Sequence, residues 1–88
     1  MEIKKTEFNG KPIRYKILTD NGMLLKKEDV LSIVRGKDTT PDQGSLDLHE
    51  AITLAYANED PAFAEWLQEN FSGYSLEALI RPNPDTWE

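Results

Sequence analysis

The alternation of apolar and polar residues predicts β-strands in the first 25 residues of the chain. Residues 3–8 and 12–18 alternate at the two-residue period of a strand. Asn9-Gly10 lies between these runs, and this dipeptide is the strongest short signal for a hairpin turn. A second turn at residues 20–22 leads into the short apolar run 23–25. Together these signals predict a small antiparallel β-meander.

The apolar period lengthens to that of a helix after this meander. Residues 27–35 carry apolar side chains at helical spacing, and a polar loop is predicted over residues 37–46. Asp47 then offers an N-cap, and Glu50 three residues later gives a pattern similar to a capping box. The apolar stripe that follows predicts a second helix that ends near Asn58.

Two further helices are predicted towards the C-terminus. Asp60-Pro61 places an N-cap directly before a proline at the first helical position. Ser75 is expected to cap a short last helix, which Pro82 stops. Residues 1–81 are therefore predicted to form one α+β domain, and residues 82–88 a loosely ordered tail. In this domain a β-meander of about three strands packs against three or four helices.

The charged residues are sorted along the chain. Residues 1–37 hold nine Lys and Arg residues against five Asp and Glu residues, which is a net charge of +4. Residues 38–88 hold one Arg against eleven Asp and Glu residues, which is a net charge of −10, and the whole chain carries −6. Charge determines partners more than fold, so this division favours a binding protein whose two surfaces prefer opposite partners.

Length and composition exclude several classes of protein. A chain of 88 residues leaves little room for a deep pocket beside its core, which disfavours an enzyme with an enclosed site. There is no cysteine, so disulfides and thiolate metal sites are excluded. No apolar run approaches the roughly 20 residues of a membrane helix, and no signal-peptide core follows Met1. We therefore expect a cytoplasmic protein without a cofactor or a membrane partner.

Three stretches of the chain carry a resemblance to a known family. They are residues 8–14 with their glycine turn, residues 20–31 with an Asp-Val helix start, and residues 46–71 with a proline break and Phe-x-x-Trp spacing. Residues 79–81, Leu-Ile-Arg, are similar to the family's closing Ile-Arg. In this order they resemble the BRO-N domain of bacteriophage antirepressors and baculovirus repeated-ORF proteins. The resemblance covers nearly the whole chain and implies the BRO-N fold, a phage context in a bacterial host cell, and DNA binding in transcriptional control.

The chain departs from this family mainly in charge. Glu59 and Asp60 stand between the two later helices, where the family usually carries serine and basic residues. Glu65 and Glu69 flank Trp66, where basic residues are common. Several positive charges that would support contact with DNA are thus missing or reversed. The resemblance therefore supports the fold and the phage context more than it supports DNA binding.

The acidic residues of the helices are the first candidate binding site. They would present a negative surface to a basic protein, as a charge mimic of a phosphate backbone at a host nucleic-acid-binding or defence protein. The alternative is that these carboxylates only keep the protein soluble. The opposite charges of the two halves also allow head-to-tail self-association or a symmetric homodimer. The candidate residues of this acidic surface are Glu59, Asp60, Glu65, Glu69 and Glu77.

The basic residues of the predicted hairpin are the second candidate site. Their functional interpretation is contact with DNA phosphates, which would make binding strongly dependent on salt. The alternative is an ordinary solvated sheet face whose lysines protect an edge. The candidate residues of this basic surface are Lys4, Lys11, Arg14, Lys16, Lys26 and Lys27.

Three aromatic residues and the single histidine are the remaining candidates. Phe63 and Trp66 have the helical spacing of core residues. Trp87 is a candidate partner-binding residue, because tryptophan is enriched at interface hot spots. In its proline-flanked tail it either folds back on the domain, docks into a partner or extends into solvent. His49 lies beside Glu50, but capping already explains that carboxylate, so no metal or acid–base site is predicted.

The sequence therefore supports two functional hypotheses. The first is a small phage- or prophage-derived regulatory module that binds protein through its acidic helical face. The second is an antirepressor-like transcriptional regulator that binds DNA through the basic hairpin. An enzyme is not expected, because neither a set of nucleophile, base and orienting group nor a phosphate-cradling glycine motif is present.

Overall fold

The predicted hairpin forms the first two strands of an antiparallel sheet. In this computed structural model, residues 3–18, 21–34 and 44–78 are described. The turn residues Asn9 and Gly10 have φ angles of 51° and 81°, the positive values that a two-residue hairpin turn requires. The register closes on this turn with Phe8 opposite Lys11. The β-meander expected from the alternation of residues is thus confirmed.

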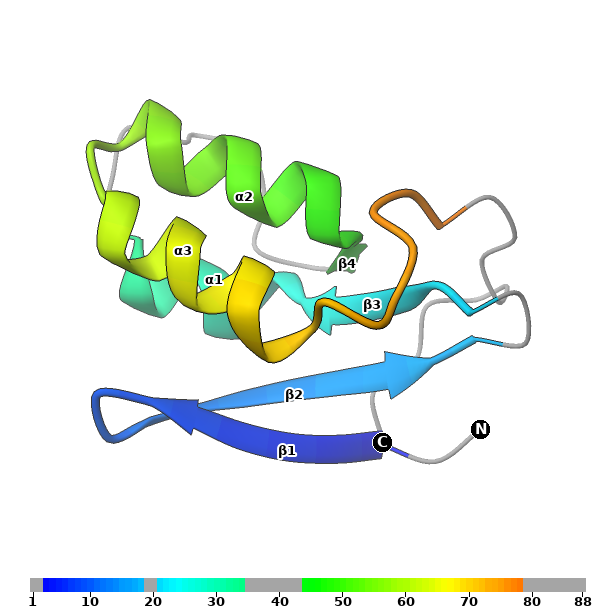
Figure 1. The fold of residues 1–88 in the computed structure, drawn as a ribbon. Helices are drawn as coiled ribbons and strands as arrows, with labels where there is room; N and C mark the ends of the chain where they lie inside the picture. Colours follow the sequence, from blue (N-terminus) through cyan, green and yellow to red (C-terminus); the bar gives the residue numbers. More distant parts are fainter. Residues whose placement is uncertain (1–2, 19–20, 35–43, 79–88) are drawn as a thin grey trace.

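The described residues form an α+β fold, as predicted from the sequence. The sheet has four strands in the order β1-β2-β3-β4, and every neighbouring pair is antiparallel. Figure 1 shows α2 and α3 side by side on one side of this sheet. The elements are β1 (Ile3–Phe8), β2 (Lys11–Ile17), β3 (Met23–Lys26), α1 (Lys27–Ile33), β4 (Ser45–Leu46), α2 (Leu48–Ala57) and α3 (Pro61–Asn70). None of the helices in the described part is long and apolar enough to cross a membrane.

Two of the three predicted N-caps, Asp47 and Asp60, are confirmed. The Asp47 carboxylate accepts a hydrogen bond from the Glu50 backbone N–H at 2.7 Å, and the Glu50 carboxylate accepts one from the Asp47 N–H at 3.0 Å. These two bonds make the complete capping box of α2. Asp60 accepts a hydrogen bond from the Phe63 N–H at 3.2 Å and caps α3, whose first residue is Pro61.

The fourth strand corrects the predicted loop over residues 37–46. Ser45 and Leu46 pair with Lys26 and Leu25 of β3, so the last two residues of that range are a strand. A strand of two residues is too short to show an alternation of its own, and only pairing with β3 defines it. The remainder of the predicted loop, apart from Gly44, lies outside the described residues.

The predicted helix after Ser75 is wrong for residues 75–78, which are irregular. The Ser75 N–H donates to the carbonyl of Asn21 at 2.9 Å, and the Ala78 N–H donates to the Asp47 carboxylate at 3.2 Å. The N–H groups of Ser75 and Ala78 thus bond to distant acceptors rather than to carbonyls of a helix turn, and the segment stays irregular. Residues 79–88, which include the predicted tail and Trp87, lie outside the described part of the chain.

The core lies between the sheet and the two later helices. Phe63 is fully buried, as its spacing predicts, and its ring centroid lies 5.0 Å from that of Phe8 on β1. Trp66 is half-buried and packs against the same two rings. On the opposite face of the sheet, Leu24 is buried in a separate cluster with Leu18 and Ala78. The main cluster consists of Ile13, Met23, Leu25, Val30, Val34, Leu48, Ala51, Ala55, Phe63, Ala64, Leu67 and Phe71.

Candidate interaction surfaces

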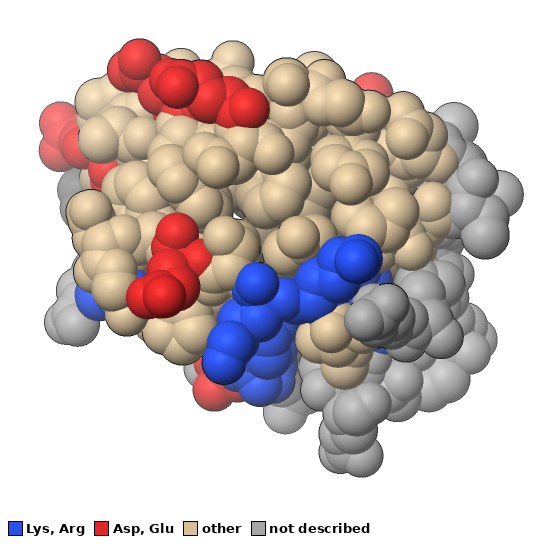
Figure 2. Space-filling model, turned by 60° about the horizontal axis from the view of Figure 1, so that its bottom comes forward, with Lys and Arg blue, Asp and Glu red and all other residues tan. Residues whose placement is uncertain are grey.

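The fold divides the described charges between two layers. The sheet and α1, residues 3–18 and 21–34, hold seven Lys and Arg residues against three Asp and Glu residues, a net charge of +4. Residues 44–78, with β4, α2 and α3, hold seven Asp and Glu residues and neither Lys nor Arg, a net charge of −7. On the face shown in Figure 2, Lys and Arg side chains gather in one central patch, while the Asp and Glu side chains lie in separate groups.

The helix α3 carries two carboxylates in positions that do not favour its own stability. Glu65 and Glu69 are exposed, and their spacing of four residues places them on the same face of the helix. Like charges at this spacing destabilise a helix slightly, and Glu69 stands in the last turn, where the helix dipole favours cations. The last turn of α3 contains no basic residue that could offset this effect. Helix stability therefore does not account for this pair.

The other acidic candidates flank α3. Glu59 is exposed in the turn between α2 and α3, where its φ angle is 59°. Asp60 is only partly exposed and caps α3, so its carboxylate has a structural role. Glu77 is exposed in the segment after α3. This segment is held against the start of α2, because the His49 N–H donates to the Leu76 carbonyl at 2.9 Å.

A bidentate ion pair joins Arg14 on β2 to Asp29 on α1. The Arg14 guanidinium donates to both oxygens of the carboxylate, from Nε at 2.9 Å and from Nη2 at 2.8 Å. The backbone N–H of Arg14 also donates to Asp29, at 2.9 Å. The pairing of β2 with β3 ends at Tyr15 and does not include Arg14, because the chain turns into α1 after Lys26. Asp29 thus accepts the Arg14 N–H in place of a backbone carbonyl of β3.

This arrangement shifts the pKa values of both partners. Burial of the Asp29 carboxyl acts to raise its pKa, but the hydrogen bonds from the Arg14 side chain and backbone and the nearby charges outweigh burial, so the pKa is lowered. The hydrogen bond to Asp29 raises the pKa of Arg14 against the effect of burial. Asp29 is 6% exposed, and its ionised form is therefore a fixed part of the fold.

Most of the other basic candidates also have partners within the molecule. Lys11 donates to the carbonyl of Ser32 at 3.1 Å, and Lys26 lies 3.3 Å from a carboxylate oxygen of Glu28. Lys16 is buried, with 5% of its surface exposed, and Lys27 also has an interaction partner. Lys4 is exposed on β1, and so is Lys5 beside it. Of the predicted DNA-contacting residues, the fold therefore leaves Lys4 most accessible.

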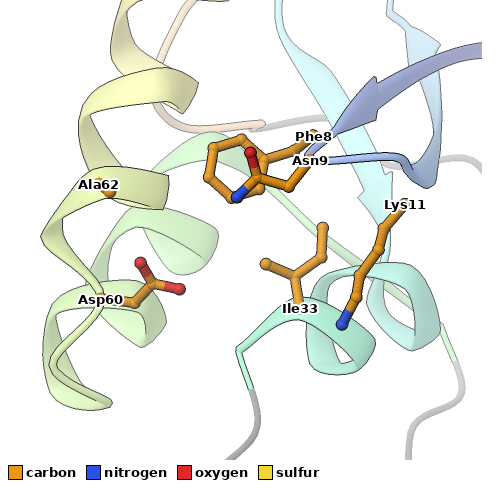
Figure 3. Close-up of a pocket in the computed structure, with 6 residues that line it drawn as sticks. All are labelled: Phe8, Asn9, Lys11, Ile33, Asp60 and Ala62. Atoms are coloured by element: carbon orange, nitrogen blue, oxygen red, sulfur yellow. The ribbon is translucent and has the colours of Figure 1, made fainter.

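A hollow of about 160 Å³ separates the hairpin turn from the start of α3. Figure 3 shows its lining: Lys11 lies across from Asp60, with Phe8 and Ile33 between them. Ligand pockets for small molecules usually measure about 300–1,000 Å³, so this hollow is small for a substrate. Its two charged groups are engaged in the contacts described above. Among the described residues no three His, Asp or Glu side chains are arranged to hold a metal ion.

The connection between Arg14 and Asp29 was not predicted from the sequence. Arg14 was expected on a DNA-contacting surface, and no partner within the molecule was predicted for it. The two residues are 15 positions apart, and nothing in their local sequence links them. The useful signal would have been the short β3, which leaves an N–H of β2 without a strand partner.

Comparisons with family models, with curated proteins and with solved structures found no match to this chain. The resemblance to the BRO-N domain therefore rests on the sequence motifs alone and stays a prediction.

Proposed function

We propose that this protein is a small binding module, without catalytic activity, that engages a basic protein partner through the acidic face of α3. The observation that carries the proposal is the placement of Glu65 and Glu69. Both are exposed on one face of α3, in a layer without Lys or Arg, at positions that helix stability does not favour. A partner with complementary charge would relieve their repulsion, so binding accounts for a pair that folding does not.

The class of partner follows from the charge of this face. Two carboxylates one turn apart on a helix resemble the spaced negative charges of a phosphate backbone, and the family resemblance suggests a bacterial host. We therefore propose a nucleic-acid-binding protein as the partner class, and inhibition or regulation of that protein as the consequence. Electrostatic complementarity of this kind mainly increases the association rate, so complex formation should weaken steeply with salt.

The test is a capture experiment from nuclease-treated bacterial lysate with immobilised protein. The wild-type chain is compared with the variant Glu65→Lys/Glu69→Lys and with the matched control Lys4→Glu/Lys5→Glu, which reverses two exposed charges on β1. We expect the wild type and the control to retain the same basic protein, and the α3 variant to lose it. Retention of that protein by all three forms would contradict the proposal.

DNA binding by the basic hairpin is the second proposal, and the contiguous patch of Lys and Arg side chains in Figure 2 is the observation in its favour. The hydrogen bonds of Arg14 and Lys11 to other parts of the molecule weigh against it. A residue that contacts phosphate must exchange such partners for the DNA, which lowers the gain from each contact. We therefore place this proposal after protein binding.

A further inference from the structure

The strand β1 lies at an edge of the sheet and has a long unpaired side. It spans Ile3–Phe8 and, among the described residues, pairs only with β2, whereas the opposite edge strand β4 has two residues. Within the described part of the chain no strand pairs with the outer side of β1, and an open groove runs along Lys5, Thr6 and Glu7. An unpaired edge of this length is a template for the addition of another strand.

The register of the hairpin shows which backbone groups are available on this side. In an antiparallel pair, hydrogen-bonded and non-hydrogen-bonded residue pairs alternate. The tight turn makes Phe8 and Lys11 a hydrogen-bonded pair, so Lys5 belongs to a non-hydrogen-bonded pair with Arg14. The Arg14 N–H agrees with this assignment, because it points away from β1 and donates to Asp29. The N–H and C=O groups of Ile3, Lys5 and Glu7 therefore face outwards.

The charges on this edge favour a second copy of the same strand. In a symmetric antiparallel pairing centred on Thr6, Lys5 lies opposite Glu7 of the partner subunit, and the two-fold axis repeats this pair. The outward-facing groups of both residues then form the hydrogen bonds. Opposite charges directly across a strand pair are stabilising, and like charges are destabilising.

The other symmetric registers lack this complementarity. Centring the pairing on Lys5 places two lysines opposite each other, and centring it on Glu7 places two glutamates opposite each other. Centring it on Lys4 also opposes two lysines. A lysine on an edge strand ordinarily deters strand addition, but in the Thr6-centred register each Lys5 meets a carboxylate.

We propose that the protein forms a symmetric homodimer in which two β1 strands pair about Thr6 and join both sheets into one. Paired residues in a sheet share a face, so the helical layers of both copies lie on the same side of the joined sheet. This proposal does not depend on the partner binding proposed above, because it uses the edge of the sheet and not α3.

The test measures the dimer dissociation constant by sedimentation equilibrium, between about 10 µM and 1 mM, a range suited to a small interface. The variants are Lys5→Glu, Glu7→Lys and the double exchange of both charges. Each single variant should raise the dissociation constant roughly tenfold, because both symmetric pairs become like-charged. The double variant should restore it to within about twofold, since opposite charges again face each other.

The control is Glu65→Lys, which makes the same charge change on α3 and should leave dimer formation unaltered. Lys5 and Glu7 are exposed, and circular dichroism checks that each variant is folded. Amide exchange gives a second measurement on the wild type: the N–H groups of Lys5 and Glu7 should exchange more slowly at higher concentration, while that of Thr6 should not change. The proposal would be overturned if the protein is a monomer throughout this concentration range. It would also be overturned if the single variants have the same dimer dissociation constant as the wild type.

Discussion

At the scale of single residues, the pair Arg14–Asp29 shows how one carboxylate can join two elements. It accepts three hydrogen bonds from one arginine and ties β2 to the first turn of α1. The nearby Glu28 is 3.9 Å from the same guanidinium and has half of its side chain exposed, so water screens it. Buried and exposed carboxylates one position apart should therefore differ strongly in their contribution to stability.

Replacement of Asp29 by Asn should lower the free energy of unfolding by about 1.5–3 kcal/mol, the usual value for hydrogen bonds to a charged group. The matched control Glu28→Gln should change it by less than about 0.5 kcal/mol. Urea unfolding at pH 7, followed by circular dichroism, measures both values. Equal effects of the two substitutions would contradict the structural role assigned to Asp29.

The same pair predicts a dependence of stability on pH. The pKa of Asp29 is lowered in the folded state, so the ionised carboxylate stabilises the fold above the unfolded pKa of about 3.9. This contribution is lost as the pH falls through the lower folded value. The difference in stability between wild type and Asp29→Asn should therefore be full at pH 6 and shrink below about pH 4.

At the scale of elements, the N-terminal residues of α3 favour helix formation, whereas a residue in its last turn opposes it. Asp60 and Pro61 fit the start of a helix, whereas Glu69 in the last turn opposes the helix dipole. The buried face of the helix, with Phe63 and Leu67 fully buried, holds it in place despite this cost. Such a balance is expected where an exposed side chain serves binding rather than stability.

Replacement of Glu69 by Lys should therefore make the protein more stable. The lysine would complement the dipole and form a favourable pair with Glu65, one turn before it, for a gain of about 0.5–1 kcal/mol. The same variant should bind the proposed basic partner less tightly. Thermal unfolding and the capture experiment measure the two effects, and a loss of stability would show that Glu69 supports the fold.

At the scale of the whole molecule, all described Lys and Arg residues lie in residues 3–18 and 21–34, whereas seven of the ten described Asp and Glu residues lie in residues 44–78. The described part of the acidic layer has a net charge of −7 and that of the basic layer +4. The exposed positive charge is reduced further, since several basic side chains are held by other groups of the protein. A DNA duplex would therefore contact few accessible cationic side chains, and the net negative charge of residues 44–78 would repel it.

We accordingly expect no saturable binding to duplex DNA at either about 50 mM or 150 mM salt. Phosphate contacts are strongest at low salt, so the lower concentration is the more demanding test. Fluorescence anisotropy with a labelled duplex is the measurement, and Lys4→Glu/Lys5→Glu is the control. Binding that falls steeply with salt and disappears in the control would instead establish the hairpin as a DNA-binding surface.

The sequence alone determined the features that depend on a few consecutive residues. Asn9-Gly10 fixes a hairpin turn through its positive φ angles, and the Asp47 and Asp60 caps fix the starts of α2 and α3. The hydrogen bonds that cap the two helices reach no further than three residues along the chain, so the local sequence contains the information for these helix starts. The order of charges and the α+β class followed in the same way.

Only the tertiary structure decided the features that depend on distant partners. Ser45 and Leu46 are a strand because β3 lies beside them, and residues 75–78 are irregular because Asn21 and Asp47 accept their hydrogen bonds. Arg14 is held within the fold because the pairing of β2 with β3 ends at Tyr15 and Asp29 accepts the Arg14 N–H instead. Each of these outcomes depends on the register in which separate segments meet, and a register is fixed by packing of the whole chain and not by any one segment.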